Sequence, residues 1–123
     1  MKKLFAVVLA GALSIGASLA LAAEPETRTV GALYQDKAAL AGKEVRVKGK
    51  VVKVNNGIMG RNFLHVQDGT GDQSSNDLTI TSKQTAAVGD SVVITGKVVL
   101  NRDFGSGYSY PLLIEESSIS PAK

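Results

Sequence analysis

The chain has no cysteine and only one histidine among its 123 residues. Without cysteine it can form no disulfide, no thiolate nucleophile and no zinc–thiolate site. The single histidine, His65, also excludes a metal site built from several histidines. The sequence contains no recognisable nucleophile–base pair, no framed pair of carboxylates and no cofactor motif. We therefore predict a protein that is not an enzyme and that has neither a cofactor nor a metal site.

The first 22 residues have the three parts of a secretory signal peptide. Met1-Lys2-Lys3 gives a positive start, residues 4–22 form a run of apolar and small residues, and Ala20-Leu21-Ala22 forms a cleavage site. The alternative is an uncleaved membrane anchor, because the run is nearly long enough to cross a bilayer. Glycines and serines lower the hydrophobicity of this run, so we predict cleavage after Ala22. The mature protein is then periplasmic or secreted, with no membrane span after cleavage.

Positive charge is scarce once the predicted signal peptide is removed. The whole chain has 14 lysines and arginines against 11 acidic residues, which gives a net charge of +3. Cleavage removes Lys2 and Lys3 and leaves the mature part with a net charge of +1. A dedicated nucleic-acid-binding domain usually has a clear basic excess, so this balance argues against such a role.

The mature part is long enough for one small domain with a modest core. Residues 23–28 are polar, contain a proline and are expected to form an N-terminal lead. Residues 29–40 place Val30, Leu33 and Leu40 near one face, which predicts a short helix that Gly42 ends. The domain is therefore expected to cover residues 29–123.

From Glu44 onward the apolar residues alternate with polar ones. This period of two predicts strands over residues 44–54, 63–67, 77–81, 91–100 and 108–115, the last at an edge or bulge because of its proline. The frame V-x-[VI]-x-G-K-V-V occurs twice, and its glycines, Gly49 and Gly96, predict a bend in the middle of each strand. Five short strands of this kind favour a small Greek-key barrel over residues 44–119, which closes its own edges.

Three motifs in this region resemble the oligonucleotide/oligosaccharide-binding (OB) fold. They are Gly49-Lys50-Val51, the aliphatic strand that ends in Asp68-Gly69-Thr70-Gly71, and the V-G-D-S-V-V-I-T-G-K-V segment that begins at Val88. Their order is similar to the nucleic-acid-binding-like branch related to anticodon-binding domains, and to small exported OB-fold proteins of Gram-negative bacteria. The resemblance covers residues 44–119. It implies a mainly β chain, a five-stranded OB-type Greek-key barrel with a short N-terminal helix, preceded by a signal peptide.

The resemblance also implies where a ligand would bind. In OB folds ligands lie across the second and third strands, flanked by two loops that correspond here to residues 55–62 and 101–109. Alternation along the second strand points Leu64 and Val66 inward and the residues between them outward. The expected ligand-binding residues lie on the outer face of the first two strands or in these loops: Lys48, Lys50, Arg61, Phe63, His65, Gln67, Arg102, Phe104 and Tyr108.

Several of these residues have a purely structural alternative. Phe63 could pack under the N-terminal helix or under the long loop over residues 101–109. His65 lacks a recognisable catalytic or metal-binding partner, so a surface or half-buried histidine without a catalytic role is favoured. The lysines of the first strand fit a solvated sheet face as well as an anionic site. The Asp68-Gly69-Thr70-Gly71 segment lacks a lysine and a following helix, so it predicts a hairpin turn and not a phosphate site.

The function that these patterns favour is an exported, non-catalytic OB-fold binding module. Its partner is an oligomeric ligand or a protein. Single-stranded nucleic acid is implied by the resemblance, whereas the weak charge and the export signal favour a glycan, a peptide or a protein at least equally. The alternative is an accessory protein of a periplasmic enzyme or redox complex, in which the barrel acts as an interaction surface.

Overall fold

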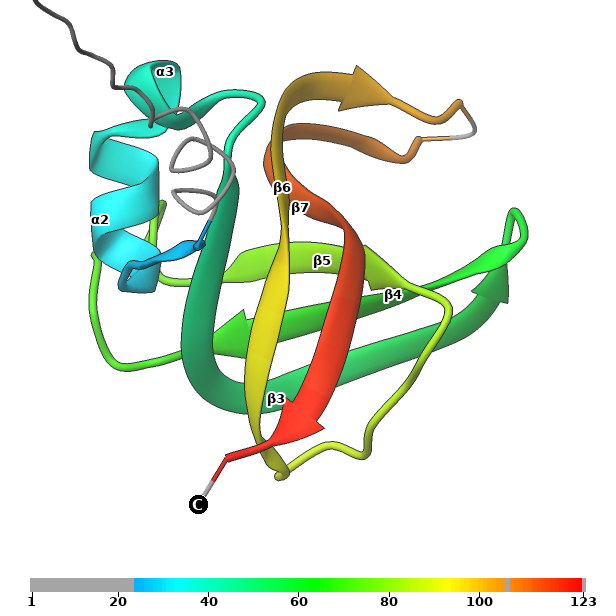
Figure 1. Cartoon of the computed structure of the whole chain (residues 1–123). Coiled ribbons are helices and arrows are strands. Elements are labelled where there is room, and N and C mark those ends of the chain that lie inside the picture. The colour runs from blue at the N-terminus through cyan, green and yellow to red at the C-terminus, as the bar shows by residue number, and fades with distance from the viewer. Residues whose placement is uncertain (1–23, 106, 123) are drawn as a thin grey trace, which may run out of the picture.

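The computed structural model describes residues 24–105 and 107–122, so the predicted signal peptide over residues 1–22 lies outside the described part. Most of the described chain is in strands, which confirms a mainly β fold. In Figure 1 the two short helices lie at one side of the sheet, and the β3–β4 and β6–β7 hairpins extend from the other side. Within the described ranges, neither helix is long enough to cross a bilayer. The elements are β2 (Glu26–Thr27), α2 (Val30–Gln35), α3 (Lys37–Leu40), β3 (Glu44–Ile58), β4 (Arg61–Gln67), β5 (Leu78–Ser82), β6 (Ser91–Asp103) and β7 (Ser109–Pro121).

All five strands predicted from the alternation of apolar residues are present. Four are longer than predicted: β3 continues to Ile58, β6 to Asp103 and β7 to Pro121, and β4 begins two residues earlier, at Arg61. A sixth strand, β2, lies within the polar segment over residues 23–28 that the sequence predicts as an N-terminal lead. It pairs in parallel with Val45 and Arg46 of β3. Because β2 has only two residues, it leaves no periodic signal in the sequence.

The strands form one sheet that closes into a ring. Their order is β2-β3-β4-β5-β7-β6, and β3 pairs in addition with β6. The long strand β3 makes this closure possible, because its first half pairs with β6 and its second half with β4. Lys50 is the residue at which β3 changes partner, since it lies opposite both Ser91 of β6 and Gln67 of β4.

The two mid-strand glycines lie where another strand approaches too closely for a side chain. A Cβ atom on Gly49 would lie 2.5 Å from Cγ1 of Val66, and one on Gly96 would lie 2.7 Å from Cγ2 of Ile114. Carbon atoms in a packed core do not approach so closely, so a side chain at either position would force the strands apart. These two close approaches explain why both copies of the repeated frame contain a glycine. Figure 1 shows that β3 curves sharply.

Aliphatic side chains fill the ring. Leu64 and Val66 of β4 point into this core, as predicted. The helices add Val30, Leu33 and Leu40 to the same cluster. Burying a side chain of this size stabilises the fold by about 1.5–3 kcal/mol, so the helices contribute to the core that holds the sheet together.

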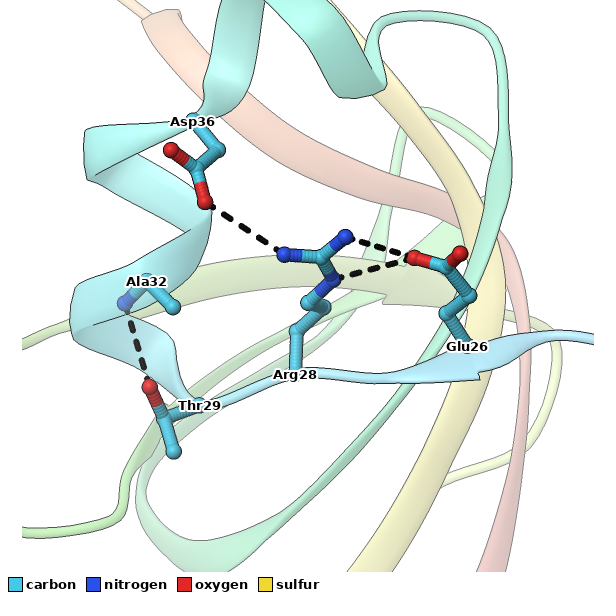
Figure 2. Close-up of polar contacts among 5 residues, drawn as sticks. All are labelled: Glu26, Arg28, Thr29, Ala32 and Asp36. Carbon is cyan, nitrogen blue, oxygen red and sulfur yellow. Dashed lines mark hydrogen bonds and ion pairs between the residues drawn. The ribbon is translucent and has the colours of Figure 1, made fainter.

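The single helix predicted over residues 29–40 is two short helices separated at Asp36. Thr29 caps the first of them, because its side chain accepts a 3.1 Å hydrogen bond from the amide of Ala32 (Figure 2). Arg28 joins the helix to β2, since its guanidinium lies 2.6 Å from Glu26 and 3.3 Å from Asp36 (Figure 2). These contacts order the segment that leads into the sheet.

Candidate functional site

The nine predicted ligand-binding residues do not form one continuous patch. They separate into three groups along the outer side of β3, β4 and the β6–β7 hairpin. One group is an aromatic and arginine cluster, the second is a histidine–aspartate pair, and the third lines a pocket at the bend of β3. The first group holds Arg61, Phe63, Arg102, Phe104 and Tyr108, the second His65, and the third Lys48, Lys50 and Gln67.

Phe63 is completely buried, so the prediction that it presents a free ring to a ligand is wrong. Its ring packs edge-on against Phe104 at a centroid distance of 5.2 Å, and lies 5.7 Å from Tyr108 and 6.0 Å from Tyr110. The structural alternative holds instead, because the β6–β7 hairpin folds over the outward-facing side of β4. Phe63 is absent from the core inside the ring and forms a second, smaller apolar cluster outside it.

Glu115 joins the two arginines of this cluster, a role that was not predicted from the sequence. Its carboxylate is 3.0 Å from Nη1 of Arg61 and 2.9 Å from Nη1 of Arg102. The guanidinium carbons of these arginines lie 5.2 and 4.5 Å from the centre of the Phe104 ring, within cation–π range. Because Glu115 is only 6% exposed, both arginines form their ion pairs with a buried carboxylate. The one sequence signal for this role is an acidic residue that directly follows an apolar run in a strand.

His65 has an acidic partner, Asp77, that the sequence analysis did not identify. Its Nδ1 lies 2.7 Å from Oδ1 of Asp77, and Nε2 of Gln67 donates to Oδ2 of the same carboxylate at 3.2 Å. The hydroxyl of Tyr34 donates to the backbone carbonyl of Asp77 at 2.6 Å. Burial and the nearby Asp77 charge raise the pKa of Tyr34, so this hydroxyl remains a donor at neutral pH.

The His65–Asp77 pair orients an imidazole but supplies only part of a catalytic site. A carboxylate that accepts from Nδ1 fixes the tautomer with a free Nε2, as in hydrolytic triads. In the part of the chain that the structure describes, no serine or threonine hydroxyl hydrogen-bonds to His65. That part also contains no group of three or more metal-ligating side chains. The pair is thus a polar contact between β4 and the residue that precedes β5.

The Asp68-Gly69-Thr70-Gly71 turn holds the start of α2. The carboxylate of Asp68 accepts from the amide of Val30 at 2.9 Å, and the hydroxyl of Thr70 accepts from the amide of Gly31 at 2.7 Å. Burial alone would raise the pKa of Asp68, but hydrogen bonds from the Thr70 hydroxyl and from backbone amides outweigh it and lower that pKa. Because β5 begins only at Leu78, this segment opens a longer connection between β4 and β5 and is not the tight hairpin turn that the sequence predicts. Its contacts join the end of β4 to α2.

A pocket of about 590 Å³ opens at the bend of β3. It is lined by Lys48, Gly49, Lys50, Val52, Gln67, Asp68, Gly69, Ser91 and Ala122. Lys48 and Lys50 are exposed, and no ion pair among the described residues involves them or Lys53. Three of the predicted site residues therefore meet in an open pocket, and its two lysines form no ion pair within the part of the chain that the structure describes.

No protein-family model and no curated protein matches the chain. Among solved structures it is similar to an OBody bound to hen egg-white lysozyme, with 18% sequence identity and a TM-score of 0.48. The match covers 69% of this chain and 88% of the matched chain. A similarity of this size carries no conclusion about ligand or function, which depend on the residues described above.

Proposed function

We propose that this protein is an exported, non-catalytic binding module on an OB-type, five-stranded Greek-key barrel. Its ligand is anionic and lies along the outer face of β3 and the end of β4. The N-terminal signal-peptide pattern supports export, and the order of the strand motifs supports the OB assignment. Binding without catalysis is proposed because the sequence contains no recognisable nucleophile–base pair and no cofactor motif.

One observation carries the choice of an anionic ligand. The exposed lysines Lys48, Lys50 and Lys53 have no acidic partner within the described ranges. The neighbouring carboxylates are engaged elsewhere, because Asp68 accepts from α2 and Asp77 accepts from β4 side chains. Positive charge on this face is therefore available to a ligand.

The aromatic end of the face is less suited to binding. Phe63 is buried, and both arginines there are paired with Glu115. A ligand that needs stacked bases would first have to displace the β6–β7 hairpin, whereas a ligand held by its charge would not. This difference favours an acidic glycan or another polyanion over a base-stacked single strand.

Binding can be tested by titrating ¹⁵N-labelled protein, residues 23–123, with two polyanions. The probes are a thymidine oligonucleotide and an oligogalacturonate of the same length. We expect amide shifts along residues 48–53 and 65–67 with the oligogalacturonate, and weaker binding as salt rises. Stronger binding of the oligonucleotide, with shifts at Phe104 and Tyr108, would favour the nucleic-acid version. The proposed function fails if neither probe shifts this face.

Export is tested separately, by expressing the full chain in a Gram-negative host. We expect a periplasmic or secreted product whose first residue is Ala23, as measured by intact mass. A full-length product that fractionates with the membrane would contradict export by cleavage. If the exported product binds neither polyanion and co-purifies with one periplasmic protein, the accessory-protein alternative is supported.

A further inference from the structure

The pocket at the bend of β3 is formed where three strands meet. Lys50 lies opposite Gln67 of β4 and opposite Ser91 of β6. The register between β3 and β4 shifts between Val51 and Lys53, and Val52 in this irregular stretch is 36% exposed at the pocket wall. The amide of Ala122 donates to the carbonyl of Ser91 at 2.9 Å, which places the end of the described chain on another wall. The pocket is therefore a consequence of the fold and not of one mobile side chain.

The walls combine small and apolar surface with a few polar groups. Gly69 and Ala122 leave the space open, while Val52 and the methylene stems of the lysines offer apolar contact. A volume of about 590 Å³ is within the range of sites that bind small molecules. It would hold a single sugar or nucleoside unit, either free or as one unit of a longer ligand.

The charge at the pocket points to an oxyanion. Lys48 and Lys50 are two residues apart on one strand, so their side chains leave the same face of β3. Asp68 is the carboxylate among the lining residues, and its oxygens accept from the amide of Val30 and from Thr70. Asp90, next to Ser91, accepts from the amide of Ala87. Both carboxylates are hydrogen-bonded within the protein, and among the described residues neither forms an ion pair with Lys48 or Lys50, so the two ammonium groups are free to contact a ligand.

We propose that this pocket binds one ring-shaped unit bearing a phosphate or carboxylate, with Lys48 and Lys50 contacting the oxyanion. This assignment rests on the proposed function, because it names the group that the β3–β4 face recognises. The lysines act as two adjustable point charges, which suit a tetrahedral phosphate or a carboxylate without demanding one fixed geometry. The ring of the ligand lies against Val52 and Ala122.

The test uses two pairs of small probes that differ mainly in the charged group. Thymidine 5′-monophosphate is compared with thymidine, and galacturonic acid with galactose, by amide shifts of ¹⁵N-labelled protein, residues 23–123. We expect saturable shifts at Gly49, Gly69 and Ser91 with the anionic member of at least one pair and none with its neutral partner. Which pair responds distinguishes a phosphate ligand from a carboxylate ligand. Equal shifts from charged and neutral partners, or no shifts from any probe, would overturn the proposal.

A charge-matched pair of variants then tests the two lysines. Lys48→Ala/Lys50→Ala is expected to weaken binding of the responsive anion by about tenfold or more, because both point charges are lost. Lys83→Ala/Lys97→Ala removes two exposed lysines that do not line the pocket, and should bind like the wild type. Their amide spectra report whether each variant is folded. Unchanged affinity of the Lys48/Lys50 variant, or equal losses in both variants, would overturn the assignment.

The same variants separate this inference from the proposed function. If a polyanion shifts amides around His65 and Lys53 and binds the Lys48/Lys50 variant as well as wild type, the binding module stands and the pocket assignment fails. If the small anions bind in the pocket while no polyanion binds, the pocket assignment stands and the oligomer-binding function fails.

Discussion

The carboxylate of Asp68 accepts a 2.9 Å hydrogen bond from the backbone amide of Val30, 38 positions earlier in the chain. The first amides of a helix have no partner within the helix, so a side-chain acceptor there satisfies an otherwise free donor. The turn after β4 therefore does more than reverse the chain. It fixes α2, the helix that delivers Val30 and Leu33 to the core.

Replacing Asp68 should destabilise the fold and change its response to acid. We expect Asp68→Ala to lower the free energy of unfolding by about 1–2 kcal/mol, the usual range for a lost helix cap. Asp68→Asn keeps an acceptor but no charge, and should lose less. Urea unfolding of residues 23–123 at neutral pH measures both. A loss within error for Asp68→Ala would mean that α2 is held by its apolar face alone.

The pH dependence has a definite sign. The pKa of Asp68 is lower in the folded state than in a free chain, so the unfolded chain takes up a proton more readily. The stability that the carboxylate contributes is therefore present above the unfolded pKa of about 3.9 and is lost as the pH falls through the folded value. The difference in unfolding free energy between wild type and Asp68→Asn should shrink over this acidic window. A difference that grows on acidification would contradict the hydrogen bonding described here.

Phe63→Ala should act mainly on the stability of the fold and not through the loss of a direct contact with a ligand. The ring is fully buried, and truncating such a side chain usually costs about 3–5 kcal/mol. Phe63→Leu keeps most of the apolar volume and should cost less. His65→Ala, two residues along the same face of β4 and partly exposed, is the matched control, with a small loss in urea unfolding. If Phe63→Ala unfolds like wild type but binds no ligand, the ring is a ligand contact after all.

Glu115 and its two arginines should respond asymmetrically to mutation. The side chain of Glu115 is 8% exposed, whereas those of Arg61 and Arg102 are 32% and 44% exposed. Stranding a buried charge costs more than stranding one that water can reach. We therefore expect Arg61→Ala/Arg102→Ala to lose about 3 kcal/mol and Glu115→Gln to lose less, about 1–2 kcal/mol. Urea unfolding of both variants gives the order of the two losses. The reverse order would mean that repulsion between the two guanidinium groups, once Glu115 is neutral, costs more than a buried carboxylate without its arginines.

The local pattern of the sequence predicted the parts of the fold that depend on near neighbours. A period of two is enough to give five strands and to direct Leu64 and Val66 inward. The glycine in each repeated frame likewise marked Gly49 and Gly96, where the strands approach closely. These features require no knowledge of which strand packs against which.

The parts that were missed depend on register and on distant segments. Alternation correctly placed Phe63 on the outer face, yet it could not show that the β6–β7 hairpin covers that face. Asp77 meets His65 because β5 pairs with β4 in one register, with Thr79 opposite His65. Asp36 interrupts the predicted helix although the apolar spacing continues through it. In each case the deciding contact lies outside the window in which a sequence pattern operates.

Met59 occupies a backbone conformation that suits a different residue. In the β3–β4 hairpin, Ile58 pairs with Arg61, and the two residues between them have φ values of 52° at Met59 and 79° at Gly60. Two positive φ angles in a two-residue loop fit a type I′ turn, which favours Asn-Gly. The left-handed conformation costs a methionine about 1 kcal/mol. Because the side chain is 44% exposed, little packing offsets that cost.

Met59→Asn should therefore stabilise the protein by about 0.5–1 kcal/mol, measured by thermal or urea unfolding. Position 101 also has a φ of 52°, but it is already occupied by an asparagine, which tolerates the left-handed conformation. Asn101→Gly should therefore change stability little. A loss of stability in Met59→Asn would mean that the methionine packs against its neighbours more than its exposure indicates. If Met59→Asn is more stable but binds the polyanion of the β3–β4 face more weakly, the strained methionine is retained for contact with the ligand. Equal binding would leave the turn as a site that can be improved without loss of function.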